Sequence, residues 1–195
     1  MILEALKKGG DMAELGKWTN SLLILFSLTI LVQAQQPEKR PDPWDPWRFF
    51  IGNWEGTGTG EPGESKVERS YEFVLEGKYI LSENRAFYPP QEKNPEGEVH
   101  LDWGMFSYDM ARKKFILRQF HVEGFVNQFV LDSISADGKT LVFTTEAIEN
   151  IPAGWRAKET YKLTGKDEFV EIFELAPPNK DFSVYSESHL KRVKE

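Results

Sequence analysis

From residue 53 to residue 193 the chain alternates short apolar runs with turn signals. The runs are rich in Val, Ile, Phe, Tyr and Thr, and none of them sustains a helical period. Glycine, aspartate and proline mark the connections between the runs. The pattern predicts strands over 53–60, 65–76, 78–88, 98–108, 114–122, 125–134, 140–148, 155–164, 168–175 and 181–193.

Short connections favour antiparallel pairing between strands that follow one another in the chain. A sheet of this many strands must protect its edges, and closure into a barrel removes them. We therefore predict an all-β fold, an up-and-down antiparallel barrel of about ten strands. A sandwich of two sheets is the alternative that the composition leaves open.

The chain begins with a segment of a different kind. Residues 22–32 form an uncharged apolar run, too short for a membrane span, which needs roughly 20 residues. Lysines precede the run and Ala34 follows it at a position suited to signal peptidase. We predict a signal peptide over 1–34, starting at Met1 or Met12, with an uncleaved anchor as the alternative.

These features predict an exported protein, periplasmic or extracellular, without stable membrane insertion after cleavage. The net charge of −7 argues against nucleic acid as a partner, and we expect a monomer. The absence of cysteine excludes a thiol nucleophile and a cysteine-rich metal site. Residues 35–44, rich in proline and charge, predict a linker, and 45–195 the barrel, which opens with a short helical turn over 45–51.

The first strand has glycine or tryptophan at every second position, namely Gly52, Trp54, Gly56, Gly58 and Gly60. Residues at this spacing lie on one face of a strand. Glycines on that face permit a sharp bend, or the close approach of another backbone, a side chain or a ligand. We predict that the tryptophan fills one end of the barrel, beside the helical turn.

Gly-x-Trp after a short helical turn resembles the opening of the lipocalin and fatty-acid-binding barrels. The longer glycine pattern is similar to the first strand of the nitrobindin-like heme-binding barrels. The rest of the mature chain, over 45–193, looks like an exported bacterial family of lipocalin-like domains without an established activity. The resemblance implies that Arg192 of the last strand packs over Trp54. It also implies that the interior binds a small hydrophobic or amphipathic molecule.

The nitrobindin resemblance implies heme as an alternative ligand, held by a histidine of the last strand. His189 is the nearest match, but strand alternation points Phe182, Val184 and Leu190 inward and His189 outward. His121 is the second candidate, on a strand whose two faces are both apolar, so its direction stays open. No two histidines have metal-ligand spacing, and we predict neither a metal site nor another cofactor.

His100 and Asp102 share one face of a strand, an arrangement that can orient an imidazole for acid–base chemistry. Val99, Leu101 and Trp103 make the opposite face the apolar one. We therefore predict that the histidine and the aspartate lie on the outside of the barrel.

Several strands place charged residues among apolar ones on the face expected inside. A buried charge must be paired or bind something. Internal ion pairs and the anchoring of a polar ligand group both remain open. The predicted ligand-binding residues are Arg69, Tyr71, Glu83, Arg85, Asn127, Phe129, Glu159, Tyr161 and Glu171.

The third hypothesis is an enzyme, an isomerase or a hydrolase, with its active site inside the same lipocalin-like barrel. His121 or His100 would be the base, and Glu83, Glu159 or Glu171 its partner. The sequence contains no nucleophile elbow and no phosphate loop, and its spacing assembles no set of nucleophile, base and orienting group. We therefore expect a binding protein rather than an enzyme.

Overall fold

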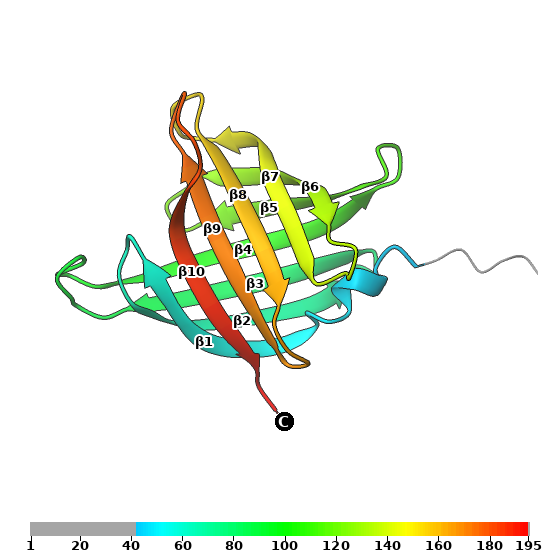
Figure 1. The fold of residues 1–195 in the computed structure, drawn as a ribbon, viewed down its shortest axis with the longest axis horizontal. Helices are drawn as coiled ribbons and strands as arrows, with labels where there is room; N and C mark the ends of the chain where they lie inside the picture. The colour runs from blue at the N-terminus through cyan, green and yellow to red at the C-terminus, as the bar shows by residue number, and fades with distance from the viewer. Residues whose placement is uncertain (1–41, 195) are drawn as a thin grey trace, which may run out of the picture. The chain divides into compact units, whose positions relative to one another are not determined.

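A computed structural model describes residues 42–194 as one closed antiparallel barrel. Each strand pairs with its neighbours in sequence, and β1 pairs with β10 to complete the circle (Figure 1). The predicted ten-stranded all-β barrel is confirmed, and the sandwich is wrong. The strands are β1 (Gly52–Gly60), β2 (Ser65–Val74), β3 (Tyr79–Tyr88), β4 (Glu98–Asp109), β5 (Lys114–His121), β6 (Val126–Ile134), β7 (Thr140–Glu149), β8 (Arg156–Leu163), β9 (Glu168–Ala176) and β10 (Ser183–Arg192).

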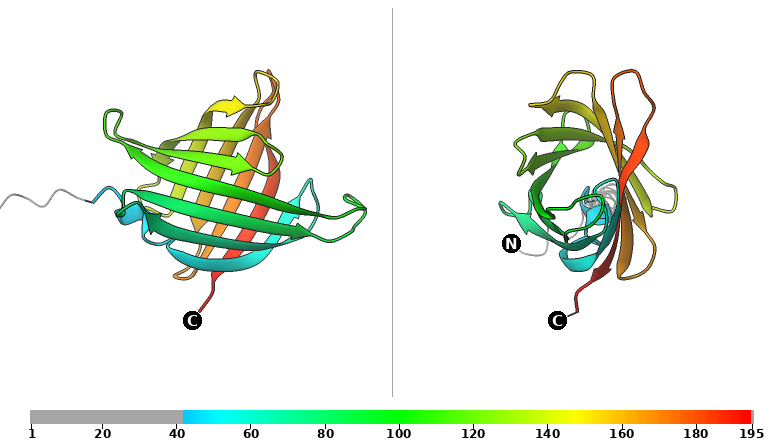
Figure 2. Two further views of the ribbon diagram at one scale, coloured as in Figure 1. Left: turned by 180° about the vertical axis from the view of Figure 1, so that it is seen from behind. Right: turned by 90° about the vertical axis from the view of Figure 1, so that its left-hand side faces the viewer.

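The helical turn expected over 45–51 is a three-residue 3-10 turn, η1 (Asp45–Trp47), which begins with a proline in its first positions. Figure 2 shows this turn at one end of the barrel. Trp47 is buried, with ring centroids 4.9 to 5.6 Å from Phe106, Phe115 and Phe143. Trp44, predicted in the linker, is also buried and packs against Phe115. The turn and its flanks therefore close this end with aromatic rings.

Trp54 lies beneath this turn and is only 1% exposed. Its Nε1 donates a hydrogen bond of 2.6 Å to the carbonyl oxygen of Phe50. The guanidinium of Arg192 lies 4.2 Å from the centroid of the indole, and its nitrogens donate to the carbonyl oxygens of Phe49 and Ile51. The predicted packing of the last strand over the tryptophan is confirmed.

The glycines of β1 permit close approach rather than curvature alone. A Cβ atom at Gly56 would lie 1.8 Å from the carbonyl oxygen of His189, so the backbone of β10 occupies the space of a side chain. At Gly58 a Cβ would lie 2.5 Å from Oγ of Ser65. The inward glycine face therefore lets β10 pair with β1 at unusually close range where the barrel closes.

The aromatic core occupies the half of the barrel next to η1. Its largest fully buried side chains are Trp47, Phe50, Trp54, Ile80, Phe106, Leu117, Phe129, Leu141, Phe143, Phe169 and Leu190. Among residues 42–194 there is no helix long and apolar enough to cross a membrane. The predicted signal peptide over 1–34, with most of the predicted linker, lies outside the described residues.

Candidate functional site

The other half of the barrel holds a cavity of about 520 Å³. Because η1 precedes β1, the loops that follow the odd-numbered strands lie at the far end, and these loops contribute Pro62, Glu123 and Pro152 to the lining. The side walls are apolar and include Phe125, Ile148, Trp155, Phe173 and Leu175. Towards the aromatic core the lining is polar and consists of Arg69, Asn84, Asp102, Gln119, Glu159 and Glu171.

The direction predicted for His100 and Asp102 is wrong. Both line the cavity, and Asp102 is only 7% exposed. The apolar residues of β4 instead face outward, with Leu101 43% and Trp103 61% exposed. The usual rule that the apolar face is the inner one fails here because the inner face of this strand segment borders a polar cavity.

The inward direction predicted for Glu83 and Arg85 is also wrong, since both are exposed. On β3 the inner face carries Ser82, Asn84 and Ala86. The register explains the inversion, because it sets Asn84 of β3 opposite both Arg69 and Asp102 of the neighbouring strands. The two exposed residues therefore take no part in the cavity.

Arg69 and Glu171 form an ion pair inside the barrel, with side chains 9% and 5% exposed. The arginine also donates to Oδ1 of Asn84 at 3.3 Å and to the hydroxyl of Tyr71 at 3.4 Å. Burial acts to lower the pKa of this arginine, but the charge of Glu171 outweighs it and holds the pKa well above its ordinary value. The guanidinium is charged and its partners are protein groups.

Glu159 is buried beside this pair. The amide nitrogen of Gln119 lies 3.3 and 3.1 Å from its two carboxyl oxygens and donates to them. Burial raises the pKa of Glu159 well above its ordinary value, and the charge and hydrogen bond of Glu171 raise it further. Burial and the neighbouring Glu171 therefore favour the protonated form of Glu159.

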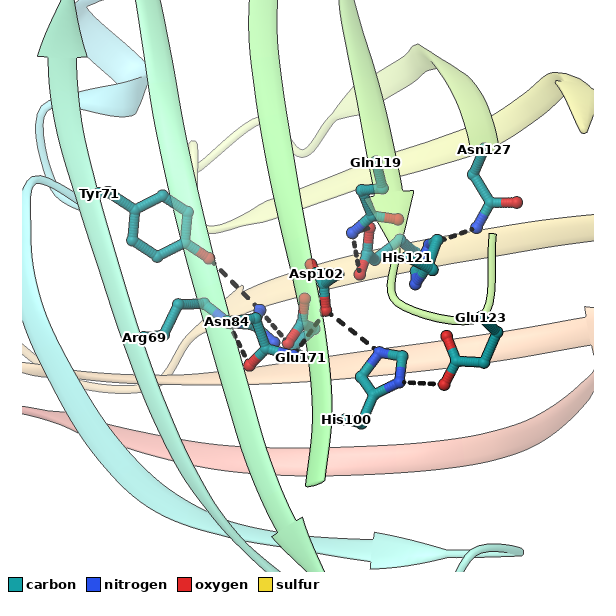
Figure 3. A network of polar contacts seen from close by, with 11 residues as sticks. Arg69, Tyr71, Asn84, His100, Asp102, Gln119, His121, Glu123, Asn127 and Glu171 are labelled. Carbon is teal, nitrogen blue, oxygen red and sulfur yellow. Dashed lines mark hydrogen bonds and ion pairs between the residues drawn. The ribbon is translucent and has the colours of Figure 1, made fainter. Parts of the chain in front are cut away.

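A second polar group centres on His100, His121 and Asp102 (Figure 3). Nε2 of His100 lies 3.3 Å from Oδ2 of Asp102, and its Nδ1 lies 2.7 Å from Oε1 of Glu123. Asn84 donates to the same Oδ2 at 2.6 Å. One metal-ligating atom from each of the two histidines and the aspartate falls within 4.8 Å of the others, so a metal ion could be held here.

The two histidines differ in their protonation. Burial lowers the pKa of His121 to about 4. Burial also acts to lower the pKa of His100, but its hydrogen bonds to Asp102 and Glu123 prevail and raise the pKa to about 9. Burial opposes ionisation of Asp102, yet the hydrogen bond from His100 and the charge of Arg69 lower its pKa. Near neutral pH His100 and Asp102 are a charged pair and His121 is neutral.

The remaining predicted residues all face the interior. Asn127 lines the cavity, where its amide nitrogen lies 3.2 Å from Nε2 of His121. Tyr71, Phe129 and Tyr161 are buried in the aromatic core beneath the cavity. A role of any of these residues in ligand binding stays a prediction.

Sequence reasoning missed Asn84, Gln119 and Glu123. Asn84 and Gln119 lie on β3 and β5, and each faces inward on the part of its strand that lines the cavity. Glu123 lies in the loop after β5, which carries no alternation. The spacing of His100 and Asp102 was the one signal that could have led to this group.

His189 lies on the outer face of β10, where Nε2 is 2.7 Å from Oε1 of Glu187, as its alternation predicted. The inward direction predicted for Val184 is wrong, because a register shift between Val184 and Ser186 turns it outward. Phe182 lies before β10 and stacks under Arg156. The last strand therefore does not fit the heme-ligand position that the resemblance implies, and heme binding through His121 stays a prediction.

Comparisons with known proteins bear on the fold alone. No family model matches the chain, and no curated protein matches it. The barrel is similar to the crystal structure of Rv2717c from M. tuberculosis, with 16% identity and a TM-score of 0.62 over 79% of this chain and 99% of that one. A protein of unknown function from the DUF3598 family of Nostoc punctiforme aligns with 8% identity and a TM-score of 0.28, over 78% of this chain and 100% of its own. Only the first similarity is strong enough to support the barrel fold.

Proposed function

We propose that the barrel binds one small amphipathic molecule in its cavity. The observation that supports this is the division of the interior, which is packed with rings in one half and left as a cavity of about 520 Å³ in the other. Ligand pockets typically measure roughly 300–1,000 Å³ and combine apolar walls with a few polar groups. In this proposal the apolar part of the ligand contacts Phe125, Ile148 and Trp155, and its polar group reaches the inner lining.

The charges around the cavity favour a neutral or cationic polar group. The lining includes five carboxyl groups but only one arginine and two histidines. Arg69 already forms an ion pair with Glu171 and donates hydrogen bonds to Asn84 and Tyr71. Few of its N–H groups therefore remain to bind the carboxylate of a ligand. A fatty acid would therefore meet an excess of acidic groups, whereas an alcohol, amide or amine would find acceptors.

Three amphiphiles of equal chain length test the proposal: an alkanol, an alkylamine and a fatty acid. Thermal unfolding is measured while each is titrated into the protein. The alcohol or the amine should raise the melting temperature saturably, because a ligand at 100 times its Kd stabilises by roughly 2.7 kcal/mol. The fatty acid should act more weakly. A panel without a saturable response, or a response to the fatty acid alone, contradicts the proposal.

Two variants of β10 test whether the amphiphile binds inside the barrel. Ser188 lines the cavity, so Ser188→Phe should fill part of it and abolish the response to the amphiphile. Glu187→Phe adds the same ring to the outer face of the same strand and serves as the matched control. Both variants are checked for parental circular dichroism. Equal binding by Ser188→Phe and the parent would mean that the cavity is not the site.

A further inference from the structure

Two neighbouring strands bring three potential metal ligands together at the cavity. His100 and Asp102 stand two residues apart on the inner face of β4, and Asp102 is paired directly with His121 of β5. One ligand atom from each residue falls within 4.8 Å of the other two. In a tetrahedral zinc site the bonds are about 2.0–2.2 Å long and the ligand atoms roughly 3.4 Å apart. Small side-chain rotations would therefore bring the three atoms to bonding distance.

A buried nitrogen without a partner points independently to a ligand. Nδ1 of His121 is shielded from solvent and has no hydrogen-bond partner in the described part of the chain. The ring cannot easily turn away, because it stacks on Phe125 with centroids 4.0 Å apart. Buried polar atoms are generally satisfied, so an atom held in this way suits coordination by an ion.

Each of the three residues also has an outer partner that fixes its orientation. Glu123 contacts Nδ1 of His100, which leaves Nε2 on the side of Asp102. Asn84 donates to Asp102. The amide of Asn127 meets Nε2 of His121, and an asparagine can present either its nitrogen or its oxygen there, so it serves both tautomers. Carboxylate contacts such as that of Glu123 typically orient metal-ligating histidines.

We propose that His100, Asp102 and His121 bind one divalent transition-metal ion, with zinc as the best match. Two imidazoles and one carboxylate suit zinc and its neighbours, whereas magnesium and calcium prefer oxygen ligands alone. Arg69 also lines the cavity, but Glu171 balances its charge. Three protein ligands leave a coordination position open towards the cavity. The proposal concerns a metal site and does not depend on the amphiphile.

Cobalt titration of the chelator-treated full-length protein tests this site. Co²⁺ is added and the visible absorption recorded, and Zn²⁺ is then added to displace it, with Mg²⁺ as the non-competing ion. We expect one equivalent of Co²⁺ to give a saturable visible band that Zn²⁺ removes and Mg²⁺ does not. Absence of a saturable band, or displacement by Mg²⁺ as readily as by Zn²⁺, overturns the proposal.

Four variants locate the ion. His121→Ala and Asp102→Asn should lose the band, and Glu123→Gln should keep the stoichiometry with an affinity roughly 10–100-fold lower. His189→Ala is the matched control, since His189 and Glu187 form a similar pair on the outer face and should not contribute. Circular dichroism confirms folding, and the isosteric Asp102→Asn decides the matter if His121→Ala does not fold. An unchanged band in Asp102→Asn, or its loss in His189→Ala, would refute the assignment.

Discussion

Trp54 joins the first strand, the helical turn and the last strand in one contact. Its ring lies against Phe49, Phe169 and the guanidinium of Arg192. Its indole nitrogen donates a hydrogen bond to the carbonyl oxygen of Phe50. A single residue thus connects segments from both ends of the described chain. Its loss should be felt by the whole barrel.

Trp54→Ala should lower the free energy of unfolding by roughly 3–5 kcal/mol, because it leaves a large cavity in a packed aromatic core. Urea unfolding, compared by midpoint at constant slope, measures the change. Trp103→Ala is the matched control: this tryptophan is 61% exposed, and its loss should change the free energy by no more than roughly 0.5 kcal/mol. Similar midpoints for Trp54→Ala and the parent would contradict a structural role for the buried indole.

At the same scale, the sequence predicted the inward polar residues only in part. Arg69, Glu159 and Glu171 alternate with aromatic residues, so the apolar-inward rule placed them correctly. The rule failed for His100 and Asp102, whose strand has its apolar residues on the outside. Polarity shows which residues share a face, but not which face borders a cavity.

Among the strands, β1 and β10 make the closest contact. A Cβ at Gly56 would collide with a backbone carbonyl, which cannot move without shifting β10. A Cβ at Gly58 would meet the hydroxyl of Ser65, which can rotate. The two glycines therefore differ in how much they tolerate a methyl group.

Gly56→Ala should destabilise the protein more than Gly58→Ala. Overpacking costs roughly 1–3 kcal/mol, and we expect Gly58→Ala near the lower end and Gly56→Ala at the upper end or above it. Thermal and urea unfolding of the two variants measure the difference. The reverse order would show that the close approach of β10 at Gly56 does not limit the side chain there.

The strands themselves were predicted within a few residues, because turn residues mark nearly every connection. The register shift between Val184 and Ser186 was not predicted, since nothing in the composition of that segment distinguishes a bulge. For the same reason Val184 was assigned to the wrong face. Alternation is reliable only while the strand stays regular.

For the whole molecule, Glu159 links stability to pH. Its pKa is raised in the folded state, chiefly by burial, whereas an unfolded glutamic acid has a pKa of about 4.3. Above that pH the folded chain holds a proton that the unfolded chain releases. The contribution of this residue is therefore complete below about pH 4.3 and is lost as the pH rises towards the folded pKa.

Glu159→Gln should remove this dependence, because the amide has nearly the same shape and no charge to bury. The free energy of unfolding of the variant, minus that of the parent, should increase between pH 4 and pH 8. Urea unfolding across this range, with chelator present to exclude metal effects, gives the difference. A difference that is constant with pH would mean that Glu159 ionises as readily in the folded barrel as in the unfolded chain.

The division of the interior into a packed aromatic half and a cavity could not be predicted from the sequence. Where the rings end and the cavity begins depends on how all the strands tilt and stagger around the barrel. Arg69 on β2 and Glu171 on β9, for example, form their ion pair only because the barrel closes. No local pattern records a contact between residues so distant in the chain.

The pairing of β1 with β10 also bears on how the barrel can close during folding. This pairing joins the first strand of the barrel to its last strand, so the barrel cannot close until β10 has been synthesised. Until then β1 presents an open edge, and the contacts between residues most distant in the sequence carry the largest loop-closure cost. The cation–π contact of Arg192 with Trp54 therefore forms only once β10 has paired with β1.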